Sequence, residues 1–388
     1  MKPVEVSLEQ VLLARENRAG RQQRLLAQYG LPLVSFTMNI AGPVKDTPLS
    51  RFAFQAGVAA LTKRLGGPVS CCLTEAVTGC EALLVYDRPA QVLKDVCMEL
   101  ESTEVGRLYD LDVLDAAGEK LSRPEMRRCL VCGGPVAVCS RSRAHGLDAI
   151  CAETTRRLAE FACTTLGDLA ADALREEAAL SPKPGLVDAR TNGAHTDMDL
   201  LLMLRSAETL RPWFCRMVRL GLDGAAPAQL QNAGRQAEAQ MLQATGGVNT
   251  HKGALYALSL LLAAMGRHLS GAQESIFSLA AADAAALAPP VGTHGSQVRR
   301  RYGCPGAREE AMDGFPSLQA LLQATGGQPA AIGLRREGKT LDVTAVPVQG
   351  EDGSWRLGAW TRDSMAGVGT LTFYDPDTGA YGALGHGI

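Results

Sequence analysis

Residues 108–114 read Leu-Tyr-Asp-Leu-Asp-Val-Leu, and this stretch indicates which kind of fold the first part of the chain adopts. Apolar and polar side chains alternate along it with a period of two, which is typical of a β-strand. Short apolar runs at 31–40 and 82–86 predict further strands, whereas residues 7–29 and 89–104 favour helices. We therefore expect residues 1–150 to form an α+β domain, with α/β as the alternative.

Downstream of this domain the hydrophobic period changes to that of a helix. From Leu158, apolar side chains recur at Phe161, Ala162, Leu169 and Ala173, which is the spacing of one helix face. Turns that contain Gly or Pro separate further helical runs at 197–220, 228–244, 252–269 and 272–288. Residues 151–323 are predicted to form an all-α domain.

A third zone follows the segment TGGQP at 325–329, which we interpret as a linker. Residues 331–349 and 355–388 are rich in Gly and strand-like in pattern. We expect 324–388 to hold this linker and a short β-rich fragment.

Length and composition limit the classes of protein to which the chain can belong. With 388 residues, two or three domains are expected. Apolar residues make up 46% of the chain and aromatic residues only 5%, which favours helices packed closely through small side chains. A net charge of −2 without a long basic run predicts no nucleic-acid or anionic-membrane partner.

Neither a signal peptide nor a membrane span is predicted. The longest apolar stretch, 254–265, is shorter than the roughly 20 residues that a span needs. The 11 cysteines are unevenly spaced, so we expect reduced thiols and a cytoplasmic protein.

An irregular loop at 181–199 concentrates charged side chains. It reads SPKPGLVD at 181–188 and NGAHTDMD at 192–199. Its candidate residues are Lys183, Asp188, His195, Asp197 and Asp199. A cation beside several carboxylates suits Mg²⁺ and a polyphosphate, because Mg²⁺ prefers oxygen ligands that it shares with phosphates. The alternative is a solvated loop whose aspartates cap the helix that starts near Asp197.

The segment TGGVNTHKG at 245–253 lies between two predicted helices. Glycines and a helix N-terminus present free backbone N–H groups to an anion, and His251 and Lys252 add charge. The spacing of a P-loop is absent. Taken alone, the segment could be a Gly-rich turn between helices.

These two segments, followed by YGCPGAREEAMDGFPS at 302–317, resemble the signature segments of triphosphoribosyl-dephospho-CoA synthases. That family is all-helical and joins 3′-dephospho-CoA to the ribose of ATP, with release of adenine. The matching positions imply that His251 lies near phosphates, and we assign catalytic roles to His195 and His251 from their chemistry. The resemblance places Lys183, Asn249, Lys252 and Arg308 near phosphates, and Asp188, Asp197 and Asp199 near Mg²⁺. Glu309 departs from the family pattern, where Gly is expected, and the synthase-like part is expected to be incomplete after Leu322.

The first zone carries a second resemblance. RQQRLLA at 21–27, VSFTMNIAGPVK at 34–45, GRLYDLDVLD at 106–115 and the segment from Arg128 to His145 resemble citrate lyase holo-acyl-carrier-protein synthases. That family has nucleotidyltransferase activity, and it transfers phosphoribosyl-dephospho-CoA to a serine of an acyl carrier protein with release of pyrophosphate.

The side chains of Asp110 and Asp112 are predicted to point to the same face of a strand, where both could bind one catalytic Mg²⁺. Exposed strand faces often carry Asp without a metal, which is the alternative. The resemblance adds Lys45 and Arg107 as substrate-binding residues.

Cys129, Cys132, Cys139 and His145 have spacings that could form a zinc site. Because the second half lacks another C-x-x-C pair, zinc is not the expected cofactor. We expect reduced, partly buried thiols and less than stoichiometric zinc.

The segment 361–388 resembles the start of the peptidase domain of sporulation factor IV B serine peptidases, with His386 in the place of the catalytic base. The chain supplies no matching nucleophile segment, so no peptidase activity is expected. The two transferase resemblances together imply a bifunctional transferase that makes and attaches the citrate lyase prosthetic group. The alternatives are a carrier-protein-binding or transferase-only protein with an inactive synthase half, and, third, a sporulation peptidase.

Overall fold

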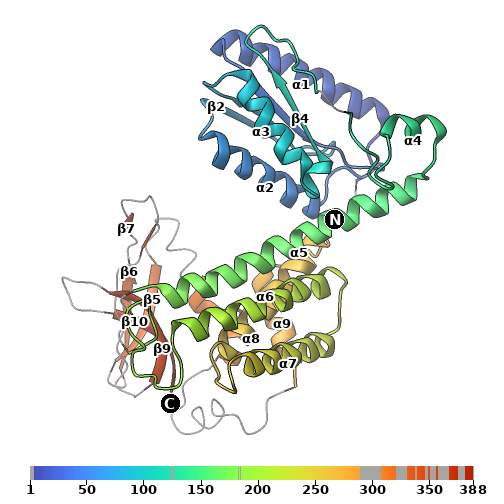
Figure 1. The fold of residues 1–388 in the computed structure, drawn as a ribbon. Helices are drawn as coiled ribbons and strands as arrows, with labels where there is room; N and C mark the ends of the chain where they lie inside the picture. The colour runs from blue at the N-terminus through green and yellow to red at the C-terminus, as the bar shows by residue number, and fades with distance from the viewer. Residues whose placement is uncertain are drawn as a thin grey trace. The chain divides into compact units, whose positions relative to one another are not determined.

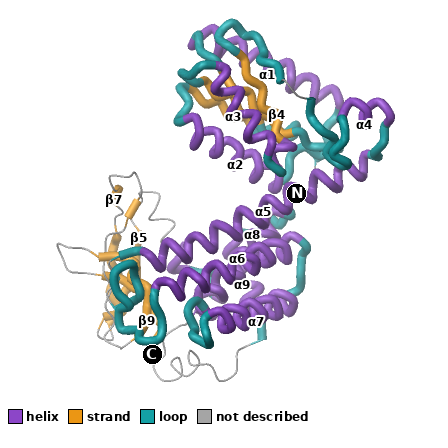
Figure 2. The backbone as a smooth tube through the Cα atoms, viewed as in Figure 1, coloured by secondary structure: helices purple, strands orange, loops and turns teal. Residues whose placement is uncertain are grey.

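A computed structural model describes residues 4–123, 126–181, 183, 185–288 and 307–319, and the backbone of strands between 330 and 387. The chain divides into two compact units. Unit 1 contains residues Met1–Thr165 and the segment His268–Gln273, and unit 2 contains the remainder. Figures 1 and 2 show strands and helices mixed in the N-terminal unit and mainly helices between residues 147 and 286.

Unit 1 is built on a four-stranded antiparallel sheet with the strand order β2-β3-β1-β4. The strands are β1 Leu33–Met38, β2 Ser70–Thr74, β3 Glu81–Val85 and β4 Tyr109–Leu114. The register places Thr37 of β1 opposite Asp110 of β4 on one side and Glu81 of β3 on the other. Because β4 lies at the edge of the sheet, one of its sides is open to the segment that follows it.

Helices cover both faces of this sheet. They are α1 Leu8–Tyr29, α2 Pro48–Leu65 and α3 Ala90–Ser102. One face carries the main core, in which the ring of Phe36 stacks on Phe54 at 4.8 Å and meets Tyr109 edge-on at 5.0 Å between ring centroids. The other face packs Leu33, Leu83 and side chains of α1. The strict alternation of β-strand side chains thus separates two apolar layers.

Helices α5 Leu147–Ala179, α6 Leu200–Leu222, α7 Pro227–Ala244, α8 Lys252–Leu269, α9 Ile276–Ala286 and α11 Ala307–Met312 follow. Small residues permit close approach between helices in unit 2. A Cβ atom added to Gly221 of α6 would lie 2.0 Å from the carbonyl oxygen of Ala263 in α8. One added to Gly266 of α8 would lie 2.3 Å from the carbonyl oxygen of Val218. The expectation of helices packed through small residues is confirmed for this pair.

Within the described residues, six strands follow the helices. They are β5 Ala330–Arg336, β6 Lys339–Ala345, β7 Val348–Gln349, β8 Trp355–Arg356, β9 Gly367–Tyr374 and β10 Tyr381–Gly387. They pair as the antiparallel hairpins β5–β6, β7–β8 and β9–β10. The predicted strand content of the third zone is confirmed.

The coarse expectation of an α+β part, a helical part and a β-rich part agrees with the structure. Four described elements of unit 1 were not predicted: α2, β2, the 3₁₀ helix η1 Val105–Leu108 and the short helix α4 Val136–Ser142. Helix α5 begins at Leu147, earlier than the periodicity from Leu158 suggested, and the division between the units falls inside it. No helix among the described residues is long and apolar enough to cross a membrane.

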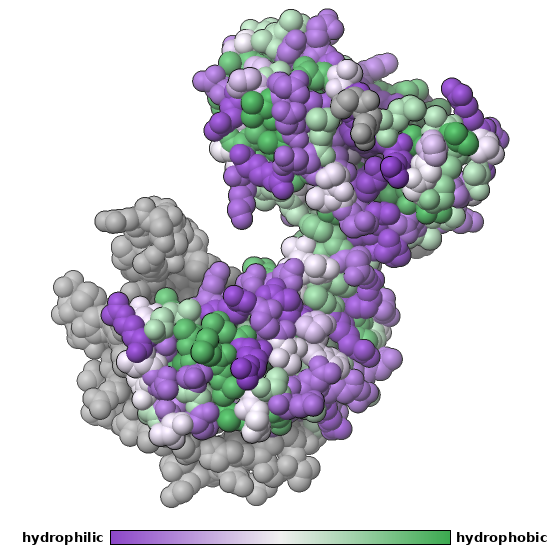
Figure 3. All heavy atoms as spheres, in the orientation of Figure 1, coloured by the Kyte–Doolittle hydropathy of each residue, from purple (hydrophilic) through white to green (hydrophobic). Residues whose placement is uncertain are grey.

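The visible face of unit 1 is covered mainly by hydrophilic residues, with small hydrophobic patches between them (Figure 3). This agrees with the burial of apolar side chains in its two layers.

The contact between α6 and α8 yields a stability prediction. Gly221→Ala should lower the free energy of unfolding of unit 2 by about 1–3 kcal/mol, because the new methyl group collides with backbone of α8. Gly234→Ala in α7 is the control, since its Cβ would meet no atom within 4 Å. That variant should be stabilised by roughly 0.5–1 kcal/mol. Urea unfolding followed by circular dichroism measures both, and equal effects would contradict the packing.

Candidate functional site

A cavity of about 400 Å³ lies beside the edge strand β4 of unit 1. Asp110 and Asp112 of β4 line it together with basic side chains. The basic residues are Lys94, Lys120, Arg123 and Arg127, and the remaining lining residues are Leu121, Ser122, Met126 and Val136. The two aspartates that the sequence predicted to share a face do meet in one cavity.

Each of these aspartates already has a cationic partner. Asp110 Oδ1 lies 3.1 Å from Arg127 Nη2, and Asp112 Oδ2 lies 2.7 Å from Lys120 Nζ. The side chain of Asp110 is 48% exposed and that of Asp112 is 32% exposed, so both remain accessible to solvent. Accessible carboxylates with exchangeable partners suit a site that accepts a metal ion or a charged substrate.

A buried carboxylate, which the sequence did not reveal, positions the arginines of this cavity. The side chain of Glu101 in α3 is only 3% exposed. It forms ion pairs with Arg123 and, at 2.5 Å, with Arg127, and it accepts a hydrogen bond from the backbone N–H of Leu111 at 3.0 Å. Arg127 also donates to the carbonyl oxygen of Tyr109 at 2.9 Å. The segment after β4 is therefore attached to the edge of the sheet.

Lys94 is a second residue that sequence reasoning missed. It lies on α3, is almost fully buried, and lines the cavity. Burial is the main cause that lowers the pKa of its ammonium group, and the charge of the neighbouring Arg123 lowers it further. An anion bound in the cavity would offset both effects. Only its position in the fold identifies it, because no local motif marks it.

Lys45 and Arg107, which the sequence predicted to bind substrate, are not among the residues that line this cavity. Lys45 donates to the carbonyl oxygen of Ile40, and burial lowers its pKa. Arg107 donates to the carbonyl oxygen of Arg128, and burial and Arg127 lower its pKa. Their substrate-binding roles stay predictions.

The segment 21–27 reaches the same face of the sheet from α1. Arg18 and Arg21 form ion pairs with Glu81, which is opposite Thr37 in the register. Arg21 also donates to Thr74 at 2.8 Å. Because Asp110 is opposite Thr37 on the other side, these polar side chains form one row across the sheet.

In unit 2, Asp188 organises the loop at 181–199. Its carboxylate accepts hydrogen bonds from the backbone N–H groups of Lys183, Arg190 and Thr191 at 3.0, 2.7 and 2.8 Å. These bonds lower its pKa to about 2. Lys183 is buried, and its Nζ donates to the carbonyl oxygen and carboxylate of Glu177 at 2.6 and 3.1 Å. Both residues stabilise the loop in this arrangement.

The other acidic residues of the loop lie at its surface. Asp199 caps α6, because its Oδ1 accepts a hydrogen bond from the N–H of Leu202 at 2.8 Å. This is the capping role that the sequence offered as the alternative. His195 Nδ1 lies 3.6 Å from Asp197 Oδ1. Metal binding by these aspartates, and the catalytic role of His195, stay predictions.

His251 is the buried centre of a polar cluster in unit 2. Its Nδ1 lies 2.8 Å from the hydroxyl of Ser206, which also accepts a hydrogen bond from Thr250 at 2.7 Å. Burial and the charge of Lys183 lower its pKa to about 4, so the ring is neutral at pH 7. Its buried Nε2 has no hydrogen-bond partner among the described residues. Sequence reasoning found His251 and missed Ser206.

The remaining predicted phosphate ligands have local contacts. Asn249 accepts a hydrogen bond from the N–H of Lys252 at 3.2 Å, at the start of α8. Lys252 Nζ lies 2.6 Å from Glu238, and its side chain is 48% exposed. Arg308 donates to the carbonyl oxygen of Leu287 at 2.8 Å. Lys252 is the most accessible cation of this set for a phosphate.

The two predicted Mg²⁺ sites differ in how well their donors fit. Asp110 and Asp112 place two accessible carboxylates in one cavity, which fits an ion that shares its other ligands with phosphates. Asp188, Asp197 and Asp199 do not form a cluster of three ligand groups within the described part of the chain. Two of them also bind backbone N–H groups.

Two known transferase families match successive parts of the chain. The family described as apo-citrate lyase phosphoribosyl-dephospho-CoA transferase matches residues 6–161. The family described as ATP:dephospho-CoA triphosphoribosyl transferase matches residues 163–326. A third family, SpoIVB peptidase S55, matches residues 353–388, where side chains lie outside the described structure.

Two curated relatives match most of the chain, and a third matches part of it. Protein CitXG of Haemophilus influenzae is 37% identical over 355 residues, which cover 82% of this chain and 76% of that protein. Protein CitXG of Leuconostoc mesenteroides is 31% identical over 67% of this chain and 61% of its own length. The 2-(5''-triphosphoribosyl)-3'-dephosphocoenzyme-A synthase of Klebsiella pneumoniae is 45% identical over 42% of this chain and 61% of its own length. The chain belongs to the CitXG family.

The buried state of His251 predicts a pH dependence of stability. The unfolded state binds more protons than the folded state between the folded pKa of about 4 and the ordinary value of 6.5. The stability that the neutral His251 ring contributes is therefore complete above pH 6.5 and is lost as the pH falls toward about 4. The full shift corresponds to about 3 kcal/mol.

Urea unfolding of wild type and His251→Gln over this pH range measures the effect, and the difference between them should shrink as the pH falls. In an NMR titration, Lys183→Met should raise the pKa of His251, because the charge of Lys183 lowers it. A His251 ring that titrates near 6.5 in the wild type would contradict the buried, neutral state.

Proposed function

We propose that the cavity beside β4 is the site from which phosphoribosyl-dephospho-CoA is transferred to a serine of an apo carrier protein. The observation that supports this most directly is the placement of Asp110 and Asp112 among four cationic side chains. The matched family, described as apo-citrate lyase phosphoribosyl-dephospho-CoA transferase, covers this unit. The chain then acts in the biosynthesis of the citrate lyase prosthetic group.

The charges of the cavity fit a polyphosphate substrate. Two carboxylates and four cations leave an excess of positive charge, and burial together with Arg123 still lowers the pKa of Lys94 although Asp112 acts in the opposite direction. A triphosphate chain would supply anions to Lys94, Arg123 and Arg127. Lys120 and Arg127, which now pair with the aspartates, could turn to the phosphates when a metal takes their place.

Asp110 and Asp112 would hold Mg²⁺, which would stabilise the negative charge that develops on the leaving pyrophosphate. Glu101 keeps Arg123 and Arg127 beside the substrate phosphates. The nucleotidyltransferase-like assignment of unit 1 rests on this chemistry: the carrier serine attacks one phosphorus atom, and the bond from that phosphorus to pyrophosphate breaks.

For unit 2 we propose the preceding step, in which 3′-dephospho-CoA is joined to the ribose of ATP and adenine is released. The family described as ATP:dephospho-CoA triphosphoribosyl transferase supports this proposal. The neutral imidazole of His251 could accept a proton from the attacking hydroxyl, with Ser206 holding the opposite nitrogen. Lys252 is exposed at the N-terminus of α8, which supports a role for it in binding a phosphate.

The two rival functions have less support. A carrier-binding protein with an inactive synthase half would not release adenine, which separates it from the proposal. The peptidase alternative rests only on the match of residues 353–388 to the SpoIVB peptidase S55 family.

Substitutions of the cavity aspartates test the transfer step. Asp110→Asn or Asp112→Asn should reduce transfer to an apo carrier protein by roughly 10²–10⁴-fold, because each removes charge from the metal site. Supplied triphosphoribosyl-dephospho-CoA is the donor, and the mass of the carrier protein is the readout.

Asp95→Asn is the matched control. Asp95 lies exposed on α3, where it accepts a hydrogen bond from Gln91 at 2.8 Å, and its variant should transfer normally. Adenine release should continue in all three variants. Near-normal transfer by either cavity variant would exclude the assigned site without affecting the proposal for unit 2.

Asp199→Ser separates helix capping from metal binding in unit 2. Serine caps about as well as aspartate, so this variant should keep both stability and adenine release, whereas Asp199→Ala should lose about 1 kcal/mol of stability. Thermal unfolding and an adenine assay measure the two properties. Loss of adenine release in a stable Asp199→Ser variant would instead identify Asp199 as a metal ligand.

A further inference from the structure

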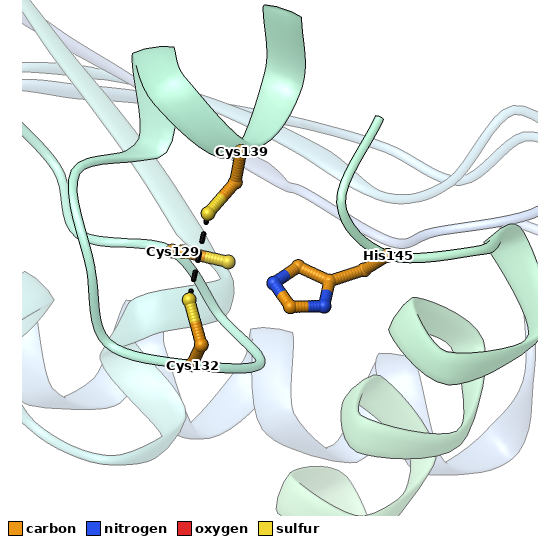
Figure 4. A group of neighbouring side chains, drawn as sticks. All are labelled: Cys129, Cys132, Cys139 and His145. Atoms are coloured by element: carbon orange, nitrogen blue, oxygen red, sulfur yellow. Dashed lines mark hydrogen bonds between the residues drawn. The ribbon is translucent and has the colours of Figure 1, made fainter. Parts of the chain in front are cut away.

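Four side chains that can bind a metal ion meet in the segment between β4 and α5. They are Cys129, Cys132, Cys139 and His145, and their ligand atoms all lie within 4.8 Å of one another. Figure 4 shows the three sulfur atoms gathered together with the His145 ring beside them. The lack of a second C-x-x-C pair argued against such a site in the sequence. In the structure, α4 and the loop after it supply the other two ligands.

The backbone from Cys129 to Gly134 forms a tight turn, and the sulfur atoms of Cys129 and Cys132 lie close together on it. The N–H of Cys129 donates to Gly134 O at 2.7 Å, and the N–H of Gly133 donates back to Cys129 O at 3.0 Å. Gly133 has a φ of 70°, a conformation that favours glycine.

His145 provides an independent observation. Its Nε2 is buried and has no hydrogen-bond partner among the described residues. A buried, unpaired ring nitrogen is costly unless a ligand satisfies it. Figure 4 places this ring beside the three cysteine sulfurs, where a bound ion would be that ligand.

We propose that Cys129, Cys132, Cys139 and His145 bind one Zn²⁺ ion in a closed, structural site. A Cys₃His donor set is typical of structural zinc, and Zn–S bonds of about 2.3 Å in a tetrahedron separate sulfur atoms by about 3.8 Å. The sulfur atoms of Cys132 and Cys139 lie 3.4 Å apart, so small side-chain rotations complete the site.

The distance between the sulfur atoms of Cys132 and Cys139 also distinguishes this arrangement from a disulfide. At 3.4 Å, the sulfur atoms of Cys132 and Cys139 are well beyond the S–S bond length of about 2.05 Å. A disulfide between them would also leave Cys129 and His145 without a purpose for their convergence. Zinc uses all four groups at once.

The position of the ion indicates what it stabilises. Cys129 follows Arg127, which contacts Asp110 and Glu101, by two residues. The carbonyl oxygens of Arg128 and Leu130 accept hydrogen bonds from Arg107 and Arg157. Zinc would join this segment to α4 and to His145, and would fix Arg127 at the edge of β4. This proposal stands whether or not the cavity transfers phosphoribosyl-dephospho-CoA.

Elemental mass spectrometry of the full-length chain, purified without a metal-affinity tag and under reducing conditions, tests the proposal. One zinc per chain is expected, with no more than a trace in Cys132→Ser and His145→Ala. Cys71→Ser is the matched control, because Cys71 is also an exposed cysteine of unit 1 and lies outside the cluster. It should keep its zinc.

A second measurement uses only wild-type protein, so that it can test the proposal even if the variants fail to fold. Wild-type protein prepared with Co²⁺ in place of zinc should show the visible bands of tetrahedral cobalt and a thiolate charge-transfer band. Zinc absent both after purification and after reconstitution, iron in its place, or zinc retained in Cys132→Ser would each overturn the proposal.

Discussion

The buried carboxylate of Glu101 determines how the edge of the N-terminal sheet is organised. A carboxylate that is 3% exposed needs compensating charge and hydrogen bonds, and Arg123, Arg127 and the N–H of Leu111 provide them. These contacts attach the segment after β4 to the sheet. As a result, Arg123, Arg127 and the two aspartates of β4 line the same cavity. The turn that begins at Cys129 follows Arg127 by two residues. Loss of one partner from such a buried group typically costs about 3–5 kcal/mol.

In unit 2, the described buried ionisable side chains are neutral, paired with an opposite charge or hydrogen-bonded to backbone N–H groups. His251 is kept neutral inside the helices, and Lys183 is buried by pairing with Glu177 at the end of α5. The carboxylate of Asp188 accepts hydrogen bonds from three backbone N–H groups of its own loop. Several of the charged residues that the sequence marks as ligands therefore shape the loop, and Lys252 remains accessible at the surface.

The sequence predicted those features that depend on local pattern. Alternation over 108–114 identified β4 and the shared face of Asp110 and Asp112, and helical periodicity identified α6 to α9. It missed α2, although Thr47 and Pro48 form a helix start, and it missed β2, whose residues are half exposed and do not alternate in hydrophobicity. Glu101, Lys94 and Ser206 could not be found, because their roles depend on contacts between elements far apart in the chain. The convergence of the three cysteines and His145 could not be predicted for the same reason, because α4 and the loop after it supply two of the four side chains.

One incubation tests whether a single chain performs both steps of prosthetic-group assembly. The purified protein is mixed with ATP, 3′-dephospho-CoA, Mg²⁺ and an apo citrate lyase acyl carrier protein, and the intact mass of the carrier protein is recorded. We predict that the carrier gains the mass of one phosphoribosyl-dephospho-CoA group, with release of adenine and pyrophosphate, and only when both small substrates are present. A carrier protein whose mass stays unchanged, or changes only when triphosphoribosyl-dephospho-CoA is supplied ready-made, would contradict the bifunctional assignment.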